Sequence, residues 1–146
     1  MCACIDIIKA SYTEVQRQTA KVVEQPFDMN VFLDEVNDVK KELDEVTDDI
    51  NSLVELVRSH FTELTIEESE ELCLLSTHTL NKMDELYLKL LRSPYYIGMK
   101  TSVERYQEGV SDFKELCHDL KSFNIDLRRD EAFQAMLQQL SSLVRK

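Results

Sequence analysis

The chain of 146 residues contains only two glycines, two prolines and no tryptophan. So few glycine and proline residues cannot supply the turns of a β-rich fold. They also exclude a glycine-rich loop that would cradle a phosphate group. Hydrophobic residues make up 43% and charged residues 31% of the chain, which is typical of a folded helical protein and not of a disordered one. We therefore expect an all-α protein.

Long apolar runs and an excess of positive charge are also absent. No run of about 18 apolar residues is present, so we expect no transmembrane segment. The net charge of −11 argues against binding nucleic acid or an anionic membrane surface. The first residues lack the basic region of a signal peptide, so we expect reduced cysteines and a cytoplasmic protein that reaches membranes only through its partners. Palmitoylation of Cys2 and Cys4 is an alternative, but no neighbouring membrane helix supports it.

One long apolar stripe organises the chain between residues 28 and 61. Its members recur at alternating steps of four and three residues, which keeps them on one side of an α-helix and is the spacing of a helix–helix interface. They are Phe32, Val36, Val39, Leu43, Val46, Ile50, Leu53 and Val57. We expect one helix here, capped at its start by Asp28. Because this stripe must be covered, the other segments are its expected partners.

Four further helices are predicted. The first covers residues 5–24 and is closed by Pro26. The third begins at a capping box formed by Thr65 and Glu68, and it ends at residues 93–94. Ser76, Thr77 and Thr79 interrupt its apolar face, which makes it the loosest part of the predicted core. The fourth helix carries an unbroken stripe of Met99, Val103, Tyr106, Val110, Phe113, Cys117 and Leu120. Residues 123–126 predict a break, followed by a short fifth helix at 130–144 that carries Phe133, Met136, Leu137, Leu140, Leu143 and Val144.

The predicted architecture is an antiparallel up-down bundle of three long helices with an additional N-terminal and a short C-terminal helix. The joints between the second, third and fourth helices are short, and short joints make consecutive helices antiparallel neighbours. We assign residues 1–26 to the N-terminal helix, 28–122 to the bundle and 126–146 to the C-terminal helix or linker. The first and fifth helices either cap the bundle or pack along it.

The sequence predicts no catalytic, cofactor or metal site. A di-metal site in a helical bundle needs two Glu-x-x-His pairs, and only Glu115 with His118 has this spacing. His60 and His78 lack such a partner. Zinc would need a second pair beside Cys2 and Cys4. Cys73 and Cys117 lie on apolar faces, and the acidic neighbours of Cys117 would not activate it as a nucleophile. We therefore expect no enzyme.

Several segments resemble the N-terminal regulatory domain of syntaxins, a bundle of three helices called Habc. TIEESEEL at 65–72 and TLNKM at 79–83 resemble its second helix, and SDFKELC at 111–117 resembles its last helix. FLDEV at 32–36 is similar to its first helix, and EAFQAML at 131–137 to the linker that follows. The N-terminal helix and the lack of a clear basic run after the last helix depart from the family.

The resemblance implies a module that docks helices or fusion regulators in vesicle trafficking. The implied partners are a SNARE-type helix or an SM-family regulator, bound by a monomer or a weak homo-oligomer. The outer grooves of a three-helix bundle are the expected docking sites, because a helix laid in a groove is a common mode of recognition. The alternative is a spectrin-like or coiled-coil scaffold that associates with itself through the stripe from Val36 to Val57.

Overall fold

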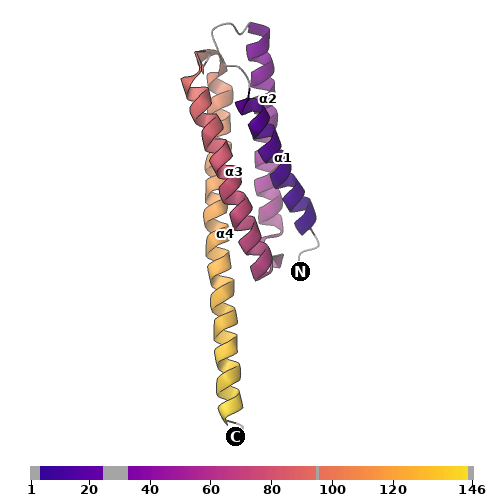
Figure 1. Ribbon diagram of the computed structural model, residues 1–146, viewed down its shortest axis with the longest axis vertical. Helices are drawn as coiled ribbons and strands as arrows, with labels where there is room; N and C mark the ends of the chain where they lie inside the picture. The colour runs from indigo at the N-terminus through magenta and orange to yellow at the C-terminus, as the bar shows by residue number, and fades with distance from the viewer. Residues whose placement is uncertain (1–3, 25–32, 95, 145–146) are drawn as a thin grey trace.

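The computed structural model describes residues 4–24, 33–94 and 96–144, and these form an all-α bundle of four helices. In chain order the elements are α1 (Ile5–Val23), α2 (Leu33–Ser59), the short 3₁₀ helix η1 (Phe61–Glu63), α3 (Ile66–Arg92) and α4 (Tyr96–Val144). Consecutive helices run in opposite directions, and α4 continues far beyond the end of the other three (Figure 1).

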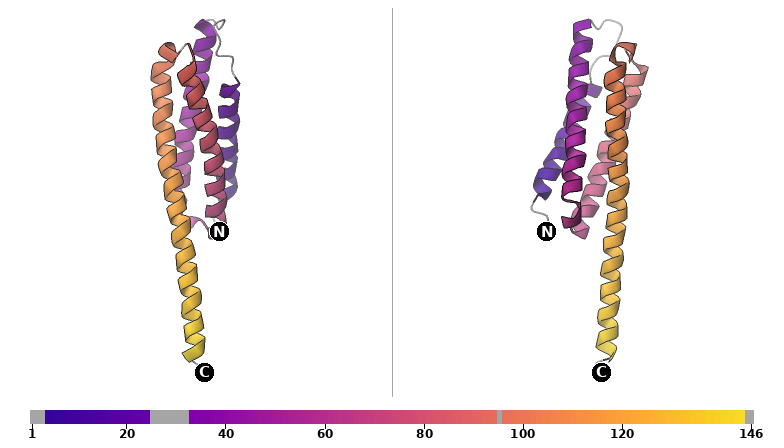
Figure 2. Two further views of the ribbon diagram at one scale, coloured as in Figure 1. Left: turned by 60° about the vertical axis from the view of Figure 1, so that its left-hand side comes forward. Right: turned by 180° about the vertical axis from the view of Figure 1, so that it is seen from behind.

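Each helix has two neighbours. α1 packs against α2 and α3, and α4 packs against the same two helices on the opposite side (Figure 2). α2 and α3, although consecutive, therefore lie diagonally across the bundle. The antiparallel directions follow from the short joints, but the predicted contact between these two helices is replaced by contacts with α1. The question of where the first helix lies is thus answered: it packs along the bundle as a full member.

The predicted stripes form the core. In α2 every stripe residue from Val36 to Val57 is buried, and all seven stripe residues of α4 from Met99 to Leu120 are buried as well. α1 contributes Ile8, Tyr12, Val15, Thr19 and Val22, and α3 contributes Leu72, Met83, Leu86 and Leu90. The rings of Tyr12 and Phe113 meet edge to face across the bundle, with centroids 6.1 Å apart. These contacts join α1 to α4 as well as to its two neighbours.

The start of α3 confirms the predicted capping box. The Thr65 hydroxyl accepts a hydrogen bond from the Glu68 backbone N–H at 3.2 Å, and the Glu68 carboxylate accepts one from the Thr65 N–H at 3.0 Å. Two backbone donors that the helix leaves unpaired are satisfied in this way. The helix ends at Arg92, as predicted from Ser93 and Pro94. Asp28, Phe32 and Pro26, predicted as cap, stripe and stop, lie outside the described residues.

The predicted break at residues 123–126 and the short fifth helix are wrong, because α4 runs without interruption for 49 residues. No glycine or proline occurs after Gly109, so nothing in the backbone forces an end. Asn124 and Asp126 are weak helix formers, but their cost is only a few tenths of a kcal/mol each. The ring of Phe123 packs on Phe61 with centroids 4.7 Å apart, which offsets that cost.

Replacing Gly109 with alanine should stabilise the protein by about 0.5–1 kcal/mol, because glycine inside a helix is disfavoured by about that amount. An added methyl group would lie 3.4 Å from the exposed Asn51 side chain and 3.6 Å from Thr47, so it fits after a small movement of Asn51. Urea denaturation measures the change in the free energy of unfolding.

Gly98→Ala provides the matched control. Gly98 lies in the first turn of α4, and nothing lies within 4 Å of an added methyl group there. We expect a gain of only a few tenths of a kcal/mol because a terminal turn is less sensitive to helix propensity. A loss of stability in Gly109→Ala would show that α2 and α4 require the absence of a side chain at this contact.

Candidate interaction surface

The residues weighed as catalytic or metal-binding candidates do not form a common site. Glu115 and His118 are exposed on α4, and His78 is exposed on α3. The His60 Nδ1 atom lies 3.0 Å from a carboxylate oxygen of Glu63, three residues further on. In the described part of the chain, no three His, Cys, Asp or Glu residues are grouped so that they could hold a metal ion.

Cys73 and Cys117, two of the three cysteines that the structure describes, are poorly suited to nucleophilic chemistry. Burial raises the pKa of the Cys117 thiol to about 11, although a hydrogen bond with Ser76 acts in the opposite direction. Burial also raises the pKa of the half-buried Cys73 thiol. A raised pKa keeps the thiol protonated at neutral pH, and the protonated form is a weak nucleophile. Cys2, which was weighed for zinc binding and palmitoylation, lies outside the described residues.

The groove between α2 and α3 is filled by α1. The hydroxyl groups of Tyr12 and Ser76 lie 2.7 Å apart in the core, and the Gln16 amide donates a hydrogen bond to the Thr79 hydroxyl at 2.8 Å. Lys9 forms an ion pair with Glu71 at 2.7 Å. Two of the polar residues that interrupt the apolar face of α3, Ser76 and Thr79, are therefore partners of α1. The exposed Thr77 hydroxyl instead donates to the Cys73 carbonyl within α3. A helical partner expected in this groove finds it occupied within the chain.

Exposed large apolar residues are most closely grouped on the projecting end of α4. Every residue from 128 to 144 is exposed. Six of them are large and apolar, with exposed fractions from 41% to 85%: Phe133, Met136, Leu137, Leu140, Leu143 and Val144. Their spacing of three and four residues places them on one side of the helix. We call this set the α4 stripe.

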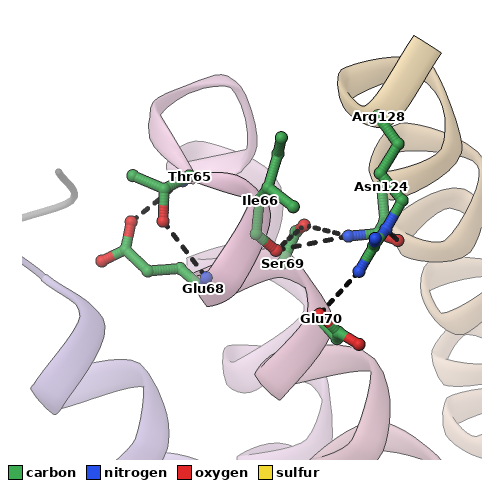
Figure 3. Close-up of polar contacts among 7 residues, drawn as sticks. All are labelled: Thr65, Ile66, Glu68, Ser69, Glu70, Asn124 and Arg128. Carbon is green, nitrogen blue, oxygen red and sulfur yellow. Dashed lines mark hydrogen bonds and ion pairs between the residues drawn. The ribbon is translucent and has the colours of Figure 1, made fainter. Parts of the chain in front are cut away.

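Side-chain contacts fix the base of the projecting segment to α3 (Figure 3). The Asn124 amide donates hydrogen bonds to the Ser69 hydroxyl at 2.7 Å and to the Ile66 carbonyl at 3.3 Å. The Arg128 guanidinium donates to the side-chain amide oxygen Oδ1 of Asn124 and forms an ion pair with Glu70 at 2.6 Å. Because these contacts lie in the turns just before the α4 stripe, they set the direction in which the helix leaves the bundle.

The α4 stripe does not continue the side of α4 that faces the bundle. Phe113, Leu120 and Leu127 follow one another at seven-residue steps, and the next position in this series is the polar Gln134. The α4 stripe begins at Phe133, six residues after Leu127. At about 100° per residue, this shift turns the apolar side by about 120°. The stripe therefore faces a different direction from the core of this bundle, and the described residues of the bundle do not cover it.

No protein-family model, no curated protein and no solved structure matches the chain. The protein is therefore described by its class, an all-α four-helix bundle with one projecting helix. Within the described residues, no helix has the length and hydropathy needed to cross a bilayer.

The sequence identified the six members of the α4 stripe as apolar residues of a helix, but it missed that they are exposed. The continuity of α4 was signalled by the absence of glycine and proline after Gly109. The exposure was signalled by the shift between Leu127 and Phe133, because a helix that stayed in one bundle would keep its apolar residues in register.

Proposed function

We propose that the protein is a non-enzymatic interaction module that binds helical protein segments through the α4 stripe. The observation that carries this proposal is the exposure of six large apolar side chains on one side of a helix that projects from the bundle. Contiguous exposed apolar surface of this kind marks interaction sites in folded proteins. A helix is the fitting partner because apolar residues at steps of three and four present a narrow stripe that a second helix can cover.

We further propose that this module acts in vesicle trafficking, as the regulatory domain of a syntaxin does. The support is the set of sequence segments that resemble the Habc domain, together with the all-helical bundle in which they lie. Four helices in place of three and the continuous α4 depart from that pattern. Since α1 fills the groove between α2 and α3, the proposed contact with a SNARE-type helix or an SM-family regulator is made by the projecting end of α4.

A binding experiment with the whole chain tests both parts. Immobilised protein is incubated with purified syntaxin-type SNARE helices and SM-family regulators, in the wild type and in two variants. Leu140→Glu places a charge in the middle of the α4 stripe. Leu74→Glu is the matched control, because Leu74 is a 70% exposed leucine on α3, outside the stripe.

Retention by the wild type and Leu74→Glu, with loss in Leu140→Glu, is the expected result. Failure of every probe to bind would overturn the trafficking function. Binding that Leu140→Glu leaves unchanged would overturn the choice of the α4 stripe as the docking surface.

A self-associating scaffold would have to use a different surface from the one expected from the sequence. The stripe from Val36 to Val57, through which self-association was expected, is buried inside the bundle. Two copies cannot meet through it without unfolding. The α4 stripe is exposed, and it is the surface that we propose for that role.

A further inference from the structure

We propose that the projecting end of α4 pairs with the same segment of a second copy of this chain in antiparallel orientation. This inference rests on the proposed function only in taking the α4 stripe as the binding surface. The segment from Ala132 to Val144 contains no charged residue, although the chain as a whole carries a net charge of −11. An uncharged, exposed helix on a strongly acidic protein is a surface on which two identical chains can meet without repulsion.

The spacing of the stripe matches an antiparallel pair of identical helices. In such pairs a residue at the first core position of one helix packs against a residue at the second core position of the other. Alignment about Gln138 places Phe133 level with Leu143 of the second copy, and Met136 level with Leu140. The same two layers recur on the other side of the axis, which gives four layers. Each layer combines leucine with a larger or more flexible side chain, so the layers have similar volumes.

Charge favours the antiparallel over the parallel orientation. Three acidic residues at the base of the projecting segment have no ion-pair partner among the described residues: Asp126, Asp130 and Glu131. Only one basic residue there, Arg129, is also without an ion-pair partner among the described residues. A parallel pair would bring these acidic bases and two acidic bundles together. In the antiparallel alignment the acidic bases and the two bundles lie at opposite ends of the pair, which separates these charges.

The bundles leave room for this pairing. The bundle borders the base of the projecting segment as far as Ala135, which lines a pocket together with Ile66 and Glu67 of α3. At about 100° per residue, Ala135 lies on the side of α4 roughly opposite the α4 stripe, so the second copy does not have to enter this pocket. The α4 stripe is also turned away from the side that packs on α2 and α3. Two helices can consequently meet over the whole stripe.

Four layers make a small interface. It falls below the roughly 1,200 Å² that stable complexes bury, so we expect a reversible dimer with a dissociation constant on the order of 10 μM. Sedimentation equilibrium of the purified whole chain from about 1 to 200 μM measures it. Leu140→Glu should weaken the dimer about 30-fold or more, because a charge would enter a central layer. Leu74→Glu should leave the dissociation constant unchanged.

Because Leu140 and Leu74 are both exposed in the single chain, neither change should unfold it, and circular dichroism checks this. A wild-type protein that stays monomeric at 200 μM would overturn the inference, and so would equal weakening by the two substitutions. The proposed function would survive either outcome if a SNARE-type helix still bound through the stripe. Failure here and failure of the proposed function are therefore distinguishable.

A photo-crosslinking experiment tests the orientation. Benzoylphenylalanine in place of Phe133 keeps an aromatic side chain at that position and reacts with its nearest neighbour on illumination. Mixed light and isotope-labelled chains identify crosslinks between copies by mass spectrometry. The antiparallel pair predicts attachment near Leu143, eight to eleven residues from the reactive position in the sequence numbering. Attachment near residue 133 of the other chain would show a parallel pair and overturn the proposed orientation.

Discussion

Replacement of Leu43 with aspartate is expected to unfold the protein. Leu43 lies in the middle of the α2 stripe, and none of its surface is exposed. A carboxylate there would lose its hydration without gaining a partner, and the leucine contacts would be lost at the same time. The combined cost is about 4–5 kcal/mol or more, a large part of the total stability of a domain of this size. Circular dichroism should show loss of helix at 25 °C.

Leu74→Asp is the control, because it makes the same chemical change at an exposed position of α3. Its free energy of unfolding should stay within about 0.5 kcal/mol of the wild type. Comparison of the two variants shows whether Leu43 is buried within one chain or between two chains. A Leu43→Asp protein that remained helical and only became smaller in sedimentation would contradict the bundle, because the α2 stripe would then have been covered by another subunit.

The helices of this protein are readable from the sequence where one side of a helix is wholly apolar. The apolar series from Val36 to Val57 in α2 and from Met99 to Leu120 in α4 predict core residues correctly, because the bundle covers both series along their whole length. The start of α3 is readable for a local reason, since Thr65 and Glu68 satisfy each other within one turn. Both kinds of signal depend on residues that are close in the sequence.

The position of α1 could not be read in the same way. Ser76 and Thr79 look like defects in an apolar face until Tyr12 and Gln16 are placed opposite them. These pairs are separated by more than sixty residues in the chain, and a periodic pattern carries no information about which helix supplies a polar partner. The diagonal arrangement of α2 and α3 follows from these contacts, so it was inaccessible too.

The α4 stripe was likewise predicted in part from local sequence signals and in part not predictable from them. Its residues were predicted as one apolar side of a helix, but exposure depends on where the neighbouring helices stop. α2 ends at Ser59 and α3 begins at Ile66, which borders α4 only as far as about Ala135. The described residues of α4 from 128 onward are therefore exposed. Weak helix formers at Asn124 and Asp126 suggested a break, yet the contacts of Asn124 with α3 keep the helix intact. Long-range contacts thus decided both the continuity and the exposure.

Stability is expected to fall steeply above pH 10 because two buried tyrosines must stay protonated in the fold. Burial raises the pKa of Tyr12 and of Tyr106 well above the usual value of about 10. The Tyr106 hydroxyl donates a hydrogen bond to the Met83 carbonyl at 2.8 Å, which also requires the proton. Above pH 10 the unfolded chain releases these two protons and the folded chain keeps them. The free energy of unfolding should then fall by about 1.4 kcal/mol per pH unit for each tyrosine, and it should be unaffected by them below pH 10.

Urea denaturation between pH 7 and pH 11.5 measures this slope, and the double variant Tyr12→Phe with Tyr106→Phe identifies its source. Loss of two hydrogen bonds should cost about 1 kcal/mol each at pH 7, but the slope above pH 10 should become shallower by about 2.8 kcal/mol per pH unit. Thr65→Ala, which loses about 1 kcal/mol through the helix cap and keeps both phenols, should retain the wild-type slope. Equal slopes in all three proteins would mean that both tyrosines ionise as readily in the folded chain as in water, which their position between the helices forbids.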